Sequence, residues 1–469
     1  MALTAKVVLT GLPMITAAAM FMQMLDSTVL NTALPTIAAD MHRSPFSMQM
    51  AVISYTLTVA LLIPVSGWLA DRCGTKKVFM GAVFLFGLGS LLCALSPSLP
   101  ALVSARIVQG VGGAMMVPVS RLALLRAYTP HDFVQVFNFV TIPGLIGPVV
   151  GPLLGGWLVT YASWHWIFLV NIPLCVLGLL VSVKKFPDFR QERGSFDLPG
   201  FLLIGAGVLL LTIGMEYTGG KTASLPLALS LMAGGFLCVA AYVRHGLRSP
   251  SPLISLKVFR IRTFAVGISG NMVARLGIGS IPFLVPLMLQ VGLNYPADVA
   301  GMLLLAPAVG SIMAKTLVLR VLNRFGYRHT LMFFTISIGG VYMLMSLQEP
   351  GWSILLLVAQ LFVQGMLMSG QFTSMNTITL GDLPGELASD GNSLLSVAQN
   401  LCLSFGVAIS TALLRFFSLS GTELYSLHAT FIAVGVMTML SALVFRLLHA
   451  QDGAHMLSRA PQNGHTRGM

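Results

Sequence analysis

The chain has 469 residues, of which 56% are hydrophobic and only 9% are charged, whereas a soluble domain carries about 25% charged residues. With a mean hydropathy of +0.86, this composition excludes an ordinary soluble domain and predicts an all-α protein that crosses the membrane many times. The net charge of +12 could suggest nucleic-acid binding. The alternative is the excess of basic residues in the cytoplasmic loops of membrane proteins.

Apolar segments of about 20 residues are long enough to cross a bilayer as helices. The sequence contains fourteen such segments, and we predict a transmembrane helix in each. The predicted spans are 12–36, 48–69, 78–96, 99–121, 133–160, 163–184, 198–217, 224–245, 263–292, 297–319, 329–347, 352–376, 391–415 and 427–449.

Two longer and more polar segments interrupt this series and bracket spans seven and eight, so the chain divides into six, two and six spans. We expect a first six-helix bundle at 1–185 and an inserted pair of helices with flanking loops at 186–262. A second six-helix bundle is expected at 263–450 and a disordered cytoplasmic tail at 451–469.

Basic residues are distributed very unevenly between the two sides of the predicted membrane. If both termini are cytoplasmic, the loops and helix ends on that side hold 21 of the 27 Lys and Arg residues, Arg121 and Arg126 among them, and the opposite loops hold two. Cytoplasmic loops carry such an excess. The count therefore predicts a multi-pass inner-membrane protein with both termini inside, and no nucleic-acid partner.

A weak internal repeat agrees with this division. The segment 71–77 follows the second span, and the similar segment 323–329 follows the tenth, 252 residues later. The segment 106–110 resembles 361–365, 255 residues later. Duplicated six-span halves are a transporter architecture.

A carboxylate, Asp26, lies near the middle of the first span. A charge at the bilayer centre costs about 2.5–3.5 kcal/mol on insertion scales, so it persists where it is paired or functional. Arg106 lies at a similar depth in span four, within about 5 Å at 1.5 Å per residue. We expect the two to pair, directly or through Gln109, and a proton on Asp26 to release the pair. An ion pair that only fixes helix packing is the alternative.

Span five carries a run of glycine and proline at 144–156. Its glycines follow at intervals of three and four residues, which keeps them on one helical face and lets another helix approach closely. The predicted helix-packing residues are Gly144, Gly147, Pro148, Gly151, Pro152 and Gly155.

The turn 67–77 between spans two and three is polar and basic. Gly74 permits a tight reversal, and Asp71 can pair with nearby cations. Membrane topology alone is the alternative explanation for the basic residues. The predicted gating loop consists of Gly67, Asp71, Arg72, Gly74, Lys76 and Lys77.

Other charged residues lie inside the predicted spans. Arg275, near the middle of span nine, is predicted to contact an anionic substrate such as a carboxylate or metal chelate, or to pair with a mobile acid; hydrogen bonds to backbone carbonyls are the alternative. Lys315 and Arg415 are closer to span ends and are expected to extend towards the membrane surface. The predicted cavity-lining residues are Gln23, Asn31, Gln109, Asn271, Arg275 and Gln364.

These segments together resemble the major facilitator superfamily, and in particular its fourteen-span drug:H⁺ antiporters. The turn 67–77 and the segment 106–110 look like the family motifs after helix two and in helix four. The run 144–156 resembles the helix-five motif of drug:proton antiporters. The segment 25–35 resembles the first-helix motif, and 164–173 the helix-six motif, with His165 at a position more often Arg.

The resemblance implies a major facilitator fold in which two six-helix bundles rock about a central cavity. It implies that Asp26 and Arg106 couple a proton to transport and that Asp71 latches the two halves on the inner side. The glycine face of span five would pack at the interface between the halves. Asn323 and Leu361 depart from the motifs in the second half, which implies a weaker second latch and one-sided coupling.

The leading functional prediction is a proton-coupled exporter of drugs or other small molecules. The alternatives are an exporter of anionic metabolites or metal chelates that uses Arg275, and a non-transporting membrane sensor of the same fold. The sequence has no HExxH, GxSxG or GxxxxGK[ST] motif, which argues against a membrane enzyme or an ATP-driven pump. We expect no cofactor or metal, a proton as coupling ion, lipid and a small-molecule substrate as partners, and a functional monomer.

Overall fold

A computed structural model describes residues 11–42, 45–192, 194–219, 225–418 and 422–457 of the chain. All regular structure in these ranges is helical, and they contain no β-strand. The predicted all-α fold class is confirmed.

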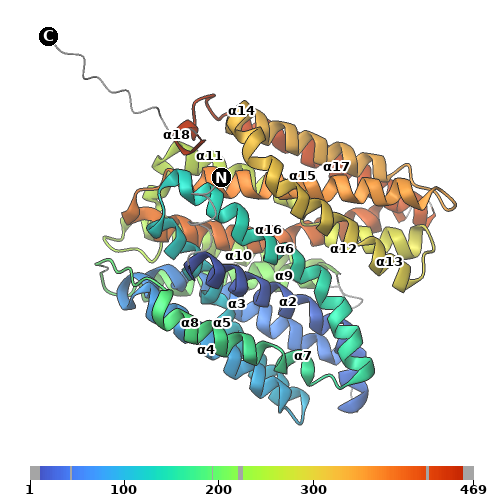
Figure 1. Ribbon diagram of the computed structural model, residues 1–469, viewed down its shortest axis with the longest axis horizontal. Helices are drawn as coiled ribbons and strands as arrows, with labels where there is room; N and C mark the ends of the chain where they lie inside the picture. Colours follow the sequence, from blue (N-terminus) through green and yellow to red (C-terminus); the bar gives the residue numbers. More distant parts are fainter. Residues whose placement is uncertain (1–10, 43–44, 193, 220–224, 419–421, 458–469) are drawn as a thin grey trace.

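The described residues of the N-terminal half form seven helices (Figure 1). They are α2 (Gly11–Asp40), α3 (Pro45–Cys73), α4 (Thr75–Ala94), α5 (Leu99–Ala127), α6 (Pro130–Tyr161), α7 (Trp166–Leu169) and α8 (Asn171–Lys185).

The inserted segment and the C-terminal half follow in the order expected. The insert contains α9 (Leu198–Gly219), α10 (Leu225–Arg248) and a 3-10 turn, η1 (Leu256–Arg260). The C-terminal half contains α11 (Arg262–Ile278), α12 (Ile281–Leu287), the π-helical η2 (Met288–Gly292), α13 (Ala297–Leu303), α14 (Leu305–Met345), α15 (Ile354–Gly381), α16 (Gly385–Ser418), α17 (Glu423–Phe445) and α18 (Ala454–Leu457).

A helix lies over each of the fourteen predicted spans. Eleven helical stretches of the described residues are long and apolar enough to cross a membrane, and one of them, Val299–Met345, covers two predicted spans. The number of membrane crossings therefore stays a prediction. The predicted tail is partly ordered, because α18 forms within it and buries Met456.

Both copies of the internal repeat make the same backbone turn. Gly74 has a φ of 95° and Gly326 a φ of 69°, in the region that only glycine adopts easily. The first turn separates α3 from α4, and the second bends α14 where two predicted spans join. A shared requirement for glycine supports the duplication inferred from the sequence.

Among the described residues, the two halves share a core at one end of the molecule only. At the end that holds the turn at Gly74 and the start of α16, called the basic end below, one apolar cluster contains Phe79 and Phe137 together with Phe264 and Leu395. At the opposite end each half has its own separate cluster. In Figure 1 the halves meet near α18 and diverge towards α7 and α13.

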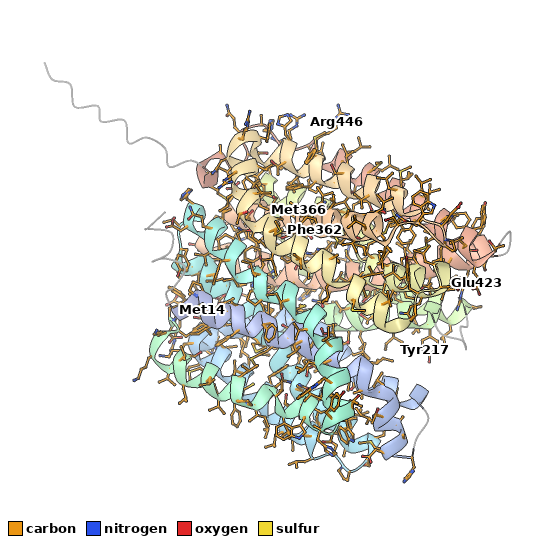
Figure 2. All side chains as sticks on the ribbon, turned by 45° about the vertical axis from the view of Figure 1, so that its right-hand side comes forward. Met14, Tyr217, Phe362, Met366, Glu423 and Arg446 are labelled. Carbon is orange, nitrogen blue, oxygen red and sulfur yellow. The ribbon has the colours of Figure 1, made fainter. Side chains whose placement is uncertain are left out.

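Close helix packing inside the C-terminal half depends on small residues. A Cβ at Gly310 of α14 would lie 3.2 Å from the backbone nitrogen of Met366 on α15, and it would also meet the carbonyl oxygen of Phe362. Figure 2 labels both α15 residues in the middle of the bundle. Such contacts stabilise helix pairs in lipid, where no hydrophobic force drives helices together.

The inserted helices lie against both halves. Helix α9 packs on α3 of the N-terminal half and on α16 of the C-terminal half. Asp197 fixes the base of the insert, because its carboxylate accepts hydrogen bonds from Gly200 N at 2.9 Å and Leu253 N at 3.0 Å. The insert therefore covers one edge of the junction between the halves.

Candidate functional site

The most completely bonded charged group lies inside the N-terminal half. Asp26 of α2 and Arg106 of α5 form an ion pair with Nη1 to Oδ2 at 2.8 Å, and each is only 1% exposed. Gln109 donates from Nε2 to Asp26 Oδ1 at 2.8 Å and accepts from Arg106 Nη1 at 2.7 Å. Both forms of the expected pairing, direct and through Gln109, are therefore present at once.

Arg106 has further partners that do not depend on Asp26. Its Nε donates to the carbonyl of Ala51 at 3.2 Å. Its guanidinium carbon lies 4.4 Å from the centre of the Tyr55 ring, a distance typical of cation–π contact. Arg106 is thus held by α3 as well as by α2.

Sequence reasoning missed two members of this group. Asn171, the first residue of α8, donates from Nδ2 to Asp26 Oδ1 at 3.2 Å. Ser90 of α4 accepts from Gln109 Nε2 at 2.8 Å. Asn171 lies in the segment 164–173 that carries a family resemblance, so the motif held a signal, although nothing in the sequence showed which way the amide would point.

The geometry allows Asp26 to gain a proton without stranding Arg106. A protonated carboxyl has an O–H donor, and a proton on Oδ2 would oppose the Nη1 donor 2.8 Å away. Arg106 already contacts Gln109 Oε1 and the carbonyl of Ala51. The site can therefore exist in a paired form and a protonated, released form.

The glycine face of α6 packs within the N-terminal half, so the expectation that it lies between the halves is wrong. A Cβ at Gly147 would lie 2.8 Å from Met24 Cβ, and one at Gly151 would meet Thr28, both on α2. A Cβ at Gly144 would lie 3.5 Å from Met20 Cε, and Gly155 is buried. The side chains of Pro148 and Pro152 lie outside the described residues. The regular spacing identified a packing face, but it could not identify the partner.

The turn after α3 takes part in a network at the basic end. Asp71, fully buried, accepts from Arg126 Nη2 of α5 at 2.6 Å. Arg126 also donates to Gln191 Oε1 at 2.9 Å. Gln191 Nε2 in turn donates to the carbonyl of Gly385 in the C-terminal half at 2.9 Å. The network reaches across the junction through Gln191 of the linker.

The other predicted gating residues have different surroundings. Lys76 Nζ donates to the carbonyl of Val183 in its own half at 2.7 Å, and Arg72 and Lys77 are exposed. A Cβ at Gly67 would lie 2.5 Å from the hydroxyls of Ser389 and Ser393 on α16. Gly67 is therefore a point of close approach between α3 and α16.

The residues predicted to line one cavity do not form one group. Arg275 Nε donates to Asn271 Oδ1 at 2.6 Å, and its guanidinium stacks over Phe372 at 5.1 Å. Gln364 contacts Met368 on its own helix. Gln23 is partly exposed. Of the predicted set, Gln109 bonds to Asp26. No hydrogen bond among the described residues connects Arg275, Gln364 or Gln23 to Asp26, and the side chain of Asn31 is outside them. A role for Arg275 in substrate contact stays a prediction.

Two basic residues cross between the halves, contrary to expectation. Arg121, counted with the loops, is 7% exposed and donates to Asn392 and Ser396 of α16. Lys315, expected to extend to the membrane surface, is 4% exposed. Its Nζ donates to Thr141 of α6 at 2.7 Å and to Thr373 of α15 at 2.8 Å. The expectation rested on depth along the helix and overlooked the buried face.

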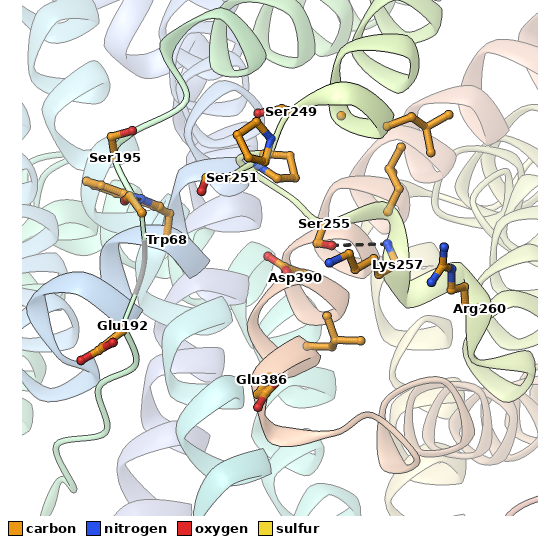
Figure 3. A pocket seen from close by; sticks show the side chains of 17 residues that line it. Trp68, Glu192, Ser195, Ser249, Ser251, Ser255, Lys257, Arg260, Glu386 and Asp390 are labelled. Atoms are coloured by element: carbon orange, nitrogen blue, oxygen red, sulfur yellow. Dashed lines mark hydrogen bonds between the residues drawn. The ribbon is translucent and has the colours of Figure 1, made fainter.

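A cavity of about 570 Å³ opens at the basic end between the insert and both halves. Figure 3 shows Trp68 of α3, Lys257 and Arg260 of the insert, and Glu386 and Asp390 of α16 around it. It is separate from the Asp26 group. It shows instead that three parts of the chain meet at the end where the halves are closed.

This combination of two helical halves, an ion pair inside one of them and a junction closed at one end defines a membrane transporter fold. The chain belongs to the Major Facilitator Superfamily, whose family model matches residues 16–243 and 267–465. The family assignment expected from the motifs is confirmed.

Two relatives are similar to this chain over almost its whole length. A protein of Citrobacter koseri named "Putative multidrug resistance protein MdtD" is 44% identical over 92% of this chain and 93% of its own length. The protein of the same name from Serratia proteamaculans is 42% identical over 97% of this chain and 96% of its own.

Two solved structures share the fold. The human organic anion transporter MFSD10 gives a TM-score of 0.68 at 13% identity, covering 93% of this chain and 99% of that one. The proton:xylose symporter XylE gives 0.66 at 14% identity, covering 96% and 98%. At these identities the similarity shows the fold alone.

Proposed function

We propose that this protein is a proton-coupled efflux transporter that exports drugs or other small molecules by alternating access. The observation that carries the proposal is the buried Asp26–Arg106 pair, a charge that the membrane interior tolerates only with a partner or a function. The multidrug resistance name of its relatives supports drugs as the substrate class.

The proposed orientation places the basic end in the cytoplasm and the protein in the inner membrane, with both termini inside. The excess of Lys and Arg in the loops on that side supports this orientation. The shared core at that end and the separate cores at the other then correspond to an outward-open arrangement. A proton that enters down about 100 mV contributes roughly 2.3 kcal/mol.

Helix α6 offers a route from the proton site to the junction. It packs closely on α2, the helix that carries Asp26, through Gly147 and Gly151. Three turns away its Asn138 donates to the carbonyl of Lys315 in the other half at 2.8 Å. A movement of α2 on protonation of Asp26 would therefore be transmitted to the junction through α6.

The decisive experiment measures drug uptake driven by a pH gradient in inverted vesicles that contain Asp26→Asn or wild-type protein. The variant should lose ΔpH-driven uptake while it still binds drug. Asp40→Asn is the matched control, since Asp40 is exposed at the end of the same helix and accepts only from Trp164 Nε1 at 2.9 Å among the bonds described. Full coupled transport by Asp26→Asn would overturn the assigned role.

The alternatives have weaker support. Export of anionic metabolites or chelates would rest on Arg275, whose Nε already has Asn271 as partner, and a sensor without transport would not need a releasable Asp26. Drug uptake by wild-type vesicles supports the first function. Uptake of an organic anion in its place would favour the second, and uptake of neither would favour the sensor. We expect no enzymatic activity, no cofactor and function as a monomer with lipid and substrate as its partners.

A further inference from the structure

The junction between the halves contains cations whose partners are all neutral. Arg121 reaches from the N-terminal half to Asn392 and Ser396, and Lys315 reaches from the C-terminal half to Thr141. Among the described residues, neither has an acid within salt-bridge distance. Each half therefore inserts one basic side chain into the other.

This arrangement differs from an ordinary buried ion pair in its energetics. A buried charge with no counter-charge costs several kcal/mol, even when hydroxyls and amides satisfy its donors. Arg121 also lies within electrostatic reach of Arg275, so a second positive charge opposes it. Separation of the halves at the basic end would return these side chains to water and remove the cost.

The two cations differ in one respect that matters. An arginine stays charged at every physiological pH, whereas a lysine can lose its proton and remain in place as a neutral amine. The amine of Lys315 would keep two N–H donors for Thr141 and Thr373, which accept its bonds at 2.7 and 2.8 Å. The closed junction thus has geometry that suits neutral Lys315 at least as well as the ammonium.

We propose that Lys315 is a titratable gate residue: its neutral form favours closure of the basic end, and its ammonium favours opening. The proposal rests on the proposed alternating access but adds a second proton-responsive group to it, in the half that the motif resemblance leaves without one. Closure then releases a proton from Lys315, and opening takes one up. A lower pH in the solution at the basic end of the molecule therefore favours the open arrangement.

Other titratable groups on the helices around Lys315 are too distant or too exposed to take its place. On α6, Asp132 is nine residues from Thr141, about 13 Å along the axis, and is bonded to Thr129. His131 of the same turn contacts the carbonyl of Met456. Helix α15 has no titratable residue.

The titratable groups on α17, α18 and α13 are distant from Lys315, and those on α14 itself are at least partly exposed or already bonded. Helix α17 carries Glu423, Tyr425 and His428 near the opposite end of the molecule. Helix α18 carries His455, which pairs with Asp382 at the surface of the basic end. Asp298 of α13 precedes α14 in the chain. On α14 itself, Arg320, Arg324 and His329 are exposed, Arg328 is partly buried and Tyr327 bonds to Thr377.

The test measures the distance between the halves rather than transport. Spin labels at Lys77 and His449, which are exposed on opposite halves at the basic end, would report open and closed populations. The measurement uses full-length protein in nanodiscs from about pH 6 to pH 10. This range covers most of the pKa values documented for buried and exposed lysines. In wild type the open-to-closed ratio should rise as pH falls, by up to about tenfold per pH unit for one proton.

Two substitutions remove titration in opposite ways. Lys315→Met should flatten the profile with the closed form favoured, and Lys315→Arg should flatten it with the open form favoured. Any slope that comes from Asp26 is common to the wild type and both variants. Lys315→Gln, which keeps an N–H donor without charge, should behave like Met and replaces the Met variant if that one does not fold. His131→Gln should keep the wild-type slope.

Retention of the wild-type slope by the Lys315 variants, or loss of the slope in His131→Gln, would overturn the proposal. So would equal plateaus for the Met and Arg variants. Because distances are measured without substrate, failure here is distinguishable from failure of the Asp26→Asn transport test. Transport without a Lys315-dependent slope would leave the proposed function standing and remove only the gate residue.

Discussion

The interior of the N-terminal half and the junction between the halves bury charge in different ways. Asp26 and Arg106 compensate each other at 2.8 Å, and amide side chains of α5 and α8 occupy the remaining carboxylate sites. At the junction, Arg121 and Lys315 donate only to hydroxyl, amide and carbonyl oxygens. One region pairs opposite charges directly, and the other is held by neutral partners.

This difference separates stability from conformational change. Contacts within a half persist while the halves rock, so their loss should lower the free energy of unfolding. Contacts between halves exist in one arrangement only, so their loss should change the ratio of arrangements. Substitutions of the same kind should therefore lower the free energy of unfolding inside a half and change the open-to-closed ratio at the junction.

The largest expected effect comes from Arg106→Gln. It leaves Asp26 buried without a cation, and loss of one partner of a buried pair costs about 3–5 kcal/mol. Unfolding of purified protein by denaturant in detergent measures this loss. The double variant Asp26→Asn with Arg106→Gln should recover part of it, and additive losses in the cycle would contradict a direct interaction.

Overpacking of the α2–α6 contact should give the next largest loss of stability. A valine at Gly151 must displace Thr28 and approach the backbone nitrogen of Val29, which a Cβ would already meet at 3.2 Å. Such insertion costs about 1–3 kcal/mol. Gly156→Val on the same helix is the control, because no atom lies within 4 Å of a Cβ there. Equal stability of the two variants would show that α2 and α6 are not in close contact.

The Asp26–Arg106 pair was predictable because cost in the membrane forces a buried acid and base to find each other. The partner of the glycine face was not predictable, since spacing fixes a face and not its neighbour. Lys315 shows a different limit. It shares a buried helical face with Ser311, Ala314 and Val318. The helical spacing of these residues can be read from the sequence, but the prediction for Lys315 used only its depth along the span.

At the junction, Gly67→Val should change the conformation more than the stability. A Cβ at Gly67 would lie 2.5 Å from two hydroxyls and 3.1 Å from the carbonyl of Ser389 on α16. If the closed form loses about 1–2 kcal/mol, the open-to-closed ratio rises roughly five- to thirtyfold, as measured by the distance between labels on the two halves. Gly81→Val, with nothing within 4 Å, should leave the ratio unchanged.

The smallest effect should come from Gln191→Ala, which removes the linker's bond to the carbonyl of Gly385. A neutral hydrogen bond contributes about 0.5–1.5 kcal/mol, so the open-to-closed ratio should rise only about two- to tenfold. Gln191 also accepts from Arg126, which keeps its own bond to Asp71 in the variant, so the unfolding midpoint should stay near wild type. A fall in unfolding stability with no change in the ratio would mean that the linker belongs to the rigid interior of one half. The boundary between the two regions would then lie at α16 rather than at the linker.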